Sequence, residues 1–278
     1  MVKRAVVMFA MLLLVFSAGC LSSDESSLES AAADTANSIE EKLVMIEAEM
    51  REGRSLILAA DGDAVVAEGV LKEIYDTGYA YSVSYQDANG ICVAVYSESD
   101  RDVVGMDFSV YGTDEAAHGG LDLVMKDYVV DEFGSGVCVL SMPLYTDDGF
   151  AGSIALCLNL DRLLGEEDAK LSDKYGYNLW VLEPSGMEIY DTDTEEVGIN
   201  VLTDARYDSP ELRAAVERIC AEKSGTVHYS IVENGNISVK DAGWTTLSFG
   251  GHEWRIGVAE IVETILVEPA DDTDGTEE

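Results

Sequence analysis

The sequence predicts an α+β fold: a long N-terminal helix followed by two tandem modules, each an antiparallel sheet of about five strands with flanking helices. The first observation is a pattern that occurs twice, in residues 82–109 and again in residues 178–203. Each copy has a β-type run, a polar turn ending in Gly, a second β-type run and an acidic stretch closed by Val-Gly. The copies start roughly a hundred residues apart, the size of a small domain. The second observation is helical spacing of apolar residues, which dominates the chain before the first copy.

The composition limits the classes of partner. The chain has 278 residues, 47% of them hydrophobic, enough for one large core or two small ones. Its 54 acidic and 17 basic residues give a formal net charge of -37, so nucleic acid and anionic lipid surfaces are unfavourable partners. We expect a solvated acidic surface, typical of a secreted protein or one from a salty habitat; selective cation binding is the alternative.

Residues 1–20 are predicted to be a lipoprotein signal peptide. Lys3 and Arg4 precede an apolar stretch that is too short to span a membrane but typical of a signal peptide. The following Ala-Gly-Cys resembles a lipobox, in which the Cys20 thiol receives the lipid, although Ser17 replaces the usual Leu. A plain cleaved signal peptide and an uncleaved anchor are the alternatives. Lipidation implies an extracytoplasmic protein that is lipid-anchored at the cell surface.

A helical region is predicted next. Residues 21–35, rich in Ser, Ala and acids, are expected to be an acidic tether, and residues 36–78 a long helical segment. Apolar residues recur at three- and four-residue steps from Ile39 to Met50, which is typical of a helix face. The Asp-Gly-Asp sequence at 61–63 predicts a break into a long and a shorter helix.

Residues 79–160 are predicted to form the first module. The runs Ala80–Tyr85 and Ile91–Ser97 flank an Asn-Gly turn, which predicts a hairpin. Val137–Pro143 and Ala151–Leu158 predict a second hairpin.

A linking helix at 161–176 and a second module at 177–262 complete the predicted fold. In this module a helix begins at Ser209-Pro210, with a capping hydroxyl and a Pro in the first turn. The predicted strands are Asn178–Leu182, Met187–Tyr190, Gly225–Val232, Ile237–Leu247 and Glu253–Ala259. Residues 263–278 are expected to form an acidic, disordered tail.

Motifs of common enzymes and metal sites are absent from the sequence. No GxSxG, HExxH or phosphate-binding loop occurs, so we expect no enzyme activity and no cofactor. No cysteine pair has CxxC spacing, the three histidines are well separated, and the acidic runs lack EF-hand order, so no metal site is expected. Cys138 and Cys157 flank a turn and either form a cross-strand disulfide or remain two buried thiols.

Four segments resemble extracellular double Cache sensor domains, which consist of two PAS-like modules. Ser141–Leu164 resembles the end of the first module, and Tyr177–Gly198 the beginning of the second. Lys240–Thr246 and Glu253–Ile256 look like the last two strands. With the long helix, the resemblance covers roughly residues 36–262.

The resemblance implies a small-molecule sensor whose first, membrane-distal module holds the ligand. Such domains usually lie between two membrane spans and feed a kinase, cyclase or chemotaxis transmitter. No second span or transmitter is found in this sequence, so we expect action through a membrane signalling partner. Solute capture for a transporter and a ligand-free interaction or assembly role are the alternatives.

The amino-acid-binding residues of the family are not found in the first module. Arg101 is its single Arg and it has no Trp, so an α-carboxylate held by a bidentate Arg is not expected. A cationic or neutral metabolite would suit the acidic and aromatic residues better.

The candidate ligand-binding residues lie on the strands and the intervening segment of the first module. They are Tyr96, Asp107, Tyr111, His118, Asp127, Tyr128 and Ser141. Alternatively, the tyrosines are half-buried core residues and His118 is a surface histidine on a loop. In the second module a further pocket could be lined by Trp180, Tyr190, Asp191, Tyr207, Tyr229 and Trp244. Core packing is the alternative for the two tryptophans.

Overall fold

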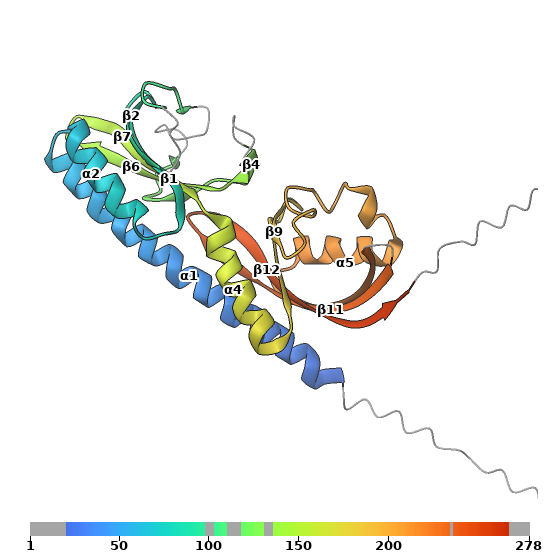
Figure 1. The fold of residues 1–278 in the computed structure, drawn as a ribbon. Coiled ribbons are helices and arrows are strands. Elements are labelled where there is room, and N and C mark those ends of the chain that lie inside the picture. The colour runs from blue at the N-terminus through green and yellow to red at the C-terminus, as the bar shows by residue number, and fades with distance from the viewer. Residues whose placement is uncertain (1–20, 98–102, 110–117, 131–135, 234–235, 267–278) are drawn as a thin grey trace, which may run out of the picture.

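The computed structural model describes residues 21–97, 103–109, 118–130, 136–233 and 236–266 (Figure 1). Its helices are α1 (Leu21–Ala59), α2 (Ala64–Tyr75), α4 (Leu160–Tyr175), the 3-10 helix η2 (Ala205–Tyr207) and α5 (Pro210–Ala221). Two five-stranded antiparallel sheets accompany them, which confirms the predicted α+β class. Within this described part of the chain, no helix combines the length and the apolar character needed to cross a membrane.

Helix α1 runs along both sheets (Figure 1). The apolar side chains of Ile39, Leu43 and Met50 on its inner side are completely buried. The predicted acidic tether at 21–35 differs from this structure, because these residues form the first turns of α1 and bury Leu28. A Cβ atom at Gly243 would lie only 2.7 Å from the Glu29 nitrogen, so the glycine lets the helix approach the second sheet closely. The alanines of this segment favour a packed helix.

The predicted break between the helices occurs at residues 61–63. Asp61 and Gly62 adopt positive φ angles of 53° and 70°. The Asp63 carboxylate then accepts hydrogen bonds from the amides of Val65 and Val66 at 3.0 and 3.1 Å. This N-cap satisfies amides at the start of α2, which have no partner within the helix.

The first sheet has the strand order β2-β1-β7-β6-β3. The strands are β1 (Ala80–Asp87), β2 (Cys92–Ser97), β3 (Val124–Met125), β6 (Val139–Thr146) and β7 (Gly149–Leu158). A separate two-stranded sheet joins β4 (Val129–Val130) to β5 (Gly136–Val137). Helices α1 and α2 pack on one face of the five-stranded sheet, which leaves the other face for a different role.

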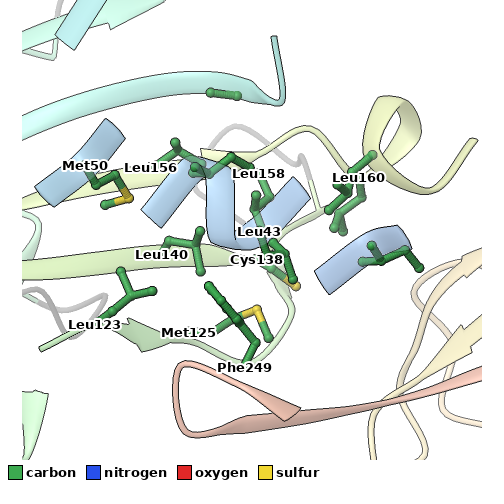
Figure 2. Close-up of a cluster of buried hydrophobic side chains, with 14 of the residues drawn as sticks. Leu43, Met50, Leu123, Met125, Cys138, Leu140, Leu156, Leu158, Leu160 and Phe249 are labelled. Atoms are coloured by element: carbon green, nitrogen blue, oxygen red, sulfur yellow. The ribbon is translucent and has the colours of Figure 1, made fainter. Parts of the chain in front are cut away.

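The core fills the space between α1 and the first sheet. Figure 2 shows Leu43 and Met50 of α1 among Leu140 and Leu156 of the central strands. Phe249 joins this cluster from the second module. The two modules therefore share one hydrophobic core instead of being joined only by a linker.

The second sheet has the strand order β10-β11-β12-β8-β9. Its strands are β8 (Asn178–Leu182), β9 (Glu188–Asp191), β10 (Gly225–Glu233), β11 (Asn236–Phe249) and β12 (His252–Ile265). Strand β12 extends to Ile265, where the sequence predicted the beginning of the tail, because residues 263–265 pair with β11. The rest of the predicted tail, residues 267–278, lies outside the described residues.

The duplicated sequence pattern folds in the same way twice. Isolated β-bridges join Ile91 to Asp107 and Met187 to Asn200. Equivalent backbone hydrogen bonds of 2.7–2.9 Å link Gly105 to Cys92 and Gly198 to Glu188, and Phe108 to Gly90 and Val201 to Gly186. The turn glycines Gly90 and Gly186 have φ angles of 81° and 86°, which explains why both copies keep a glycine there. The two modules are thus structural repeats.

All four cysteines of the described chain are free thiols. The expected alternative of a Cys138–Cys157 disulfide is wrong, because Cys157 pairs with Val139 and not with Cys138. A shift of one residue turns a side chain to the other face of a sheet. Cys138 consequently lies in the core of Figure 2, whereas Cys157 packs on the opposite face.

Candidate functional site

The face of the first sheet opposite α1 and α2 is lined by small and polar side chains. Side chains alternate along each strand, so the apolar Val83, Ile154 and Leu140 point to the helices and their neighbours point away. Of the residues that point away, Ser84, Gln86, Ser141, Ser153 and Ala155 are called the polar face below, and the apolar Val139 and Cys157 lie beside them on the same side of the sheet. The antiparallel register places Ser84 opposite Ala155 and Ala155 opposite Ser141, which brings three strands together in one row.

The polar face carries a buried hydrogen-bond network. The Gln86 amide nitrogen donates to the Ser84 hydroxyl at 2.6 Å, and the Ser153 hydroxyl donates to the Gln86 carbonyl oxygen at 3.1 Å. Gln86 is 1% exposed and Ser153 0%. Buried polar groups require hydrogen-bond partners, and these three side chains supply partners to one another at the centre of the sheet.

His118 and Ser141 meet at this face. His118 Nε2 lies 3.0 Å from the Ser141 hydroxyl, and the imidazole lies against the Phe150 ring with centroids 6.0 Å apart. His118 is 1% exposed, so its interpretation as a surface histidine is wrong. Two of the candidate residues are therefore in direct contact, although the sequence placed them on separate segments.

Two other candidates, Tyr96 and Asp107, do not reach the polar face. Tyr96 pairs with Val83 and points to the helices, where its ring contacts Tyr75 at 5.1 Å between centroids. Asp107 is exposed, and hydrogen bonding to Ser109 lowers the pKa of its carboxyl group. Tyr111 lies outside the described residues.

Asp127 and Tyr128 lie at the contact between the modules. Asp127 Oδ1 is 3.0 Å from His252 Nδ1, and Glu183 Oε1 is 3.4 Å from His252 Nε2. The Tyr128 amide donates to Glu183 Oε1 at 2.6 Å. One ligand atom each from Asp127, Glu183 and His252 lies within 4.8 Å of the others. Both imidazole nitrogens thus lie near carboxylate oxygens, and the three side chains join the first module to the second.

The second-module candidates divide between two faces of their sheet. Trp180, Asp191, Tyr207 and Tyr229 line one common cavity. Tyr190 instead points to α4, where its hydroxyl lies 3.4 Å from Asp168. Trp244 is fully buried and donates its indole N–H to the Glu222 carbonyl at 3.2 Å. It is therefore a core residue, which was the alternative interpretation of this tryptophan.

Ser84, Gln86 and Ser153 were not among the binding residues predicted from the sequence. A signal was present, because polar and apolar residues alternate strictly from Ser82 to Gln86 within a strand whose residues from Val83 to Gln86 are all buried. Polar side chains on the second face of a buried strand indicate a lined site. The missed His252 had no comparable signal, since only the tertiary fold brings it to Asp127.

The fold matches those of solved extracellular ligand-binding domains. An extracellular ligand-binding receptor from Desulfohalobium retbaense has a TM-score of 0.65 at 19% identity, over 84% of this chain and 40% of the receptor. The ligand-binding domain of the Pseudomonas fluorescens chemoreceptor CtaA, in complex with L-serine, has a TM-score of 0.65 at 16% identity, over 85% and 96% of the two chains. The ligand-binding domain of the Pseudomonas aeruginosa PAO1 amino acid chemoreceptor PctC, in complex with GABA, has a TM-score of 0.63 at 16% identity. The match covers 85% of this chain and 99% of that domain.

No family model matches the sequence, and no curated protein sequence matches it. The chain spans less than half of the Desulfohalobium receptor, at 40% of its length. These structural matches agree with the double Cache fold that the sequence motifs implied. At these identities they establish the fold, and the function is argued from the chain's own site.

Proposed function

We propose that the chain is an extracytoplasmic, non-enzymatic sensor domain whose first module binds a small uncharged metabolite on its polar face. The observation that supports this most is the buried row of Ser84, Ser141 and Ser153 hydroxyls with the Gln86 amide and the His118 imidazole. These groups donate and accept hydrogen bonds without a carboxylate or an ammonium group.

The polar face differs from an amino-acid-binding site in the charge of its side chains. An amino acid needs an anion partner for its ammonium group and a cation partner for its carboxylate. The residues of the polar face provide neither, whereas hydroxyl and amide groups suit the donors and acceptors of a sugar, nucleoside or purine-like compound. The amino acid and GABA ligands named for the structural neighbours are therefore not carried over to this chain.

A thermal-shift screen tests the proposal. A ligand present at a hundredfold excess over its Kd stabilises the folded protein by ~2.7 kcal/mol, which raises the Tm by about 5–10 °C for a chain of this size. We expect stabilisation by a member of an uncharged panel of sugars, nucleosides and purines. Stabilisation only by amino acids or carboxylates, or by no compound, contradicts the proposal.

Matched variants localise the binding. Ser153→Ala and Gln86→Met keep the size of the side chains but remove hydrogen-bonding groups from the polar face, so each should weaken binding about tenfold. Ser248→Ala, at an exposed position on β11, is the control and should bind as the unmodified protein does. Equal affinity of all variants would place the ligand elsewhere.

The membrane attachment forms a second part of the proposal. The Ala-Gly-Cys sequence supports lipidation of Cys20, which would hold the sensor at the cell surface next to a membrane signalling or transport partner. Expression with an alkyne fatty acid should label the full chain and not the Cys20→Ser variant. Equal labelling of the two would exclude Cys20 as the lipidated residue.

A further inference from the structure

The second module has a cavity at the place that corresponds to the polar face of the first. Trp180 and Ser84 each lie six residues before the equivalent turn glycines, Gly186 and Gly90. Trp180 lines a cavity of about 60 Å³, whose other lining residues come from the second sheet and from α5. The structural repeat thus has a potential site in each module, but with different side chains.

The lining of this cavity is acidic and aromatic. Three carboxyl groups belong to Glu188, Asp191 and Glu196, and one ammonium group belongs to Lys240. Aromatic rings come from Trp180, Tyr207 and Tyr229, and α5 contributes Leu212, Ala215, Val216 and Ile219. Carboxylates and the faces of aromatic rings both attract cations.

Glu196 already has partners at the rim of the cavity. The Tyr207 hydroxyl donates to Glu196 Oε2 at 2.6 Å, and Arg206 Nη1 lies 2.9 Å from Glu196 Oε1. The same Tyr207 hydroxyl is 3.4 Å from Glu188 Oε2. The Arg206 guanidinium group is therefore directed to Glu196 and not to Glu188.

Glu188 is the deepest of the three acids. It is 4% exposed, and within the described chain it forms no ion pair. Burial, together with the carboxylates of Asp191 and Glu196, raises the pKa of Glu188 well above its usual range. Burial also raises the pKa of Asp191 to about 6. The Lys240 ammonium group opposes this shift at Asp191, whereas the main influences on Glu188 include no cation that would favour its ionised form.

Trp180 adds a donor that lacks an acceptor. Trp180 is 6% exposed, and its indole Nε1 has no hydrogen-bond partner among the described residues. A buried N–H without an acceptor costs free energy, so an acceptor atom supplied by a ligand would be favourable. The cavity therefore offers acceptors on the acids and a donor on the tryptophan.

The volume limits the size of the ligand. A water-sized group needs roughly 10–15 Å³ of such a cavity, so about four or five non-hydrogen atoms fit. We propose that this second-module cavity binds a small amino alcohol or a related primary amine, with its ammonium group on Glu188 and Asp191 and an acceptor oxygen on Trp180. The ligand is distinct from the uncharged metabolite of the first module.

Binding at this cavity exchanges a ligand cation for a proton. The titratable groups that face Glu188 are Asp191 on β9, Glu196, Tyr207 on η2 and Cys220 on α5; Tyr229 and Lys240 line the same cavity from β10 and β11. An ammonium group favours ionised Glu188, whose pKa is raised, so affinity for the amine should rise with pH for as long as the amine stays charged.

Ethanolamine is the probe, and two compounds of equal size are the controls. Titration calorimetry on the full chain should show binding of ethanolamine, at least about tenfold weaker binding of ethylene glycol, which lacks the ammonium group, and weaker binding of propylamine, which lacks the oxygen. Equal binding of the three compounds, or no binding of ethanolamine, overturns the proposal.

An isosteric variant assigns the site. Glu188→Gln keeps the shape and the neutral form of the buried group, so it should fold, yet it should weaken ethanolamine binding about tenfold and remove its pH dependence. Glu217→Gln, at an exposed position on α5, should change neither. Unchanged binding in Glu188→Gln overturns the proposal. Ser153→Ala should retain the ethanolamine response, so failure of one site is distinguishable from failure of the other.

Discussion

Ser141 and His118 are 23 residues apart in the sequence, and their side chains meet at 3.0 Å on the polar face. Both could be chosen from the sequence because polar groups in this module are candidate ligand contacts. Tyr96 was chosen for the same reason, but its pairing with Val83 turns the ring to the helices. Residue type therefore predicted which groups could bind a ligand, whereas the strand register decided which of them face it.

The state of the cysteines gives a prediction at the same scale. Burial raises the pKa of the Cys138 thiol well above its usual value, which makes the native thiol unreactive. We expect Cys138 and Cys157 to be alkylated in denaturant to the same extent with and without prior reduction. Mass spectrometry of the alkylated peptides measures this, and labelling that requires a reductant would show a disulfide.

At the scale of elements, local sequence patterns predicted which helices and strands form better than they predicted the residues at which these elements begin and end. The β-type runs on either side of the Asn-Gly turn identified β1 and β2, and the Asp-Gly-Asp break separated α1 from α2. The beginning of α1 was not predictable in this way, since its Ser, Ala and acidic residues resemble a linker. Its helix is fixed by the tertiary contact of Leu28 and Glu29 with Gly243 of β11.

The packing of α1 against α4 gives a prediction about stability. Lys42 Nζ lies 2.8 Å from Glu167 and 2.9 Å from Glu166, and the Glu167 side chain is 4% exposed. Lys42→Met keeps much of the apolar packing but leaves Glu167 with Lys170 as its cationic neighbour. We expect the free energy of unfolding in urea to fall by about 2 kcal/mol. Lys174→Met, at the end of α4, is the control and should cause a much smaller loss.

The same ion pairs predict a dependence on pH. Burial raises the pKa of Glu167, but hydrogen bonds from Lys170 and Lys42 outweigh burial, so its pKa is lowered overall. An acid with a lowered pKa in the folded state stabilises the protein above its unfolded pKa, near 4.3, and loses this effect as pH falls further. Urea titrations between about pH 3 and about pH 7 should show less loss in Lys42→Met. An equal acid-induced loss would contradict this role of Lys42.

At the scale of the whole molecule, the segment 118–130 connects the polar face to the second module. It carries His118 at the polar face and Asp127 at the contact with His252. Its Met125 amide donates to the Gly250 carbonyl at 2.9 Å. The duplicated pattern predicted two modules, but the sequence could not show that they share a core, because these contacts join residues more than a hundred positions apart.

A substitution at the hairpin tip tests this connection. Gly250 has a φ of +56°, and a Cβ there would lie 2.6 Å from the Met125 nitrogen. We expect Gly250→Ala to destabilise the protein by about 2 kcal/mol and to increase amide exchange around Met125. Gly105→Ala, with a φ of +89° and no neighbour within 4 Å of the added Cβ, controls for backbone strain alone. The same exchange around Met125 in both variants would argue against the connection.

The most direct measurement is an experimental structure of the full chain with the uncharged compound that raises its Tm most. We expect the compound to lie on the polar face, with hydrogen bonds to Ser141 and Ser153 and to the Gln86 amide. Such a structure would locate the proposed ligand in the first module. A compound bound away from these three residues, or a polar face fully covered by protein side chains with no room for a ligand, would contradict the proposed function.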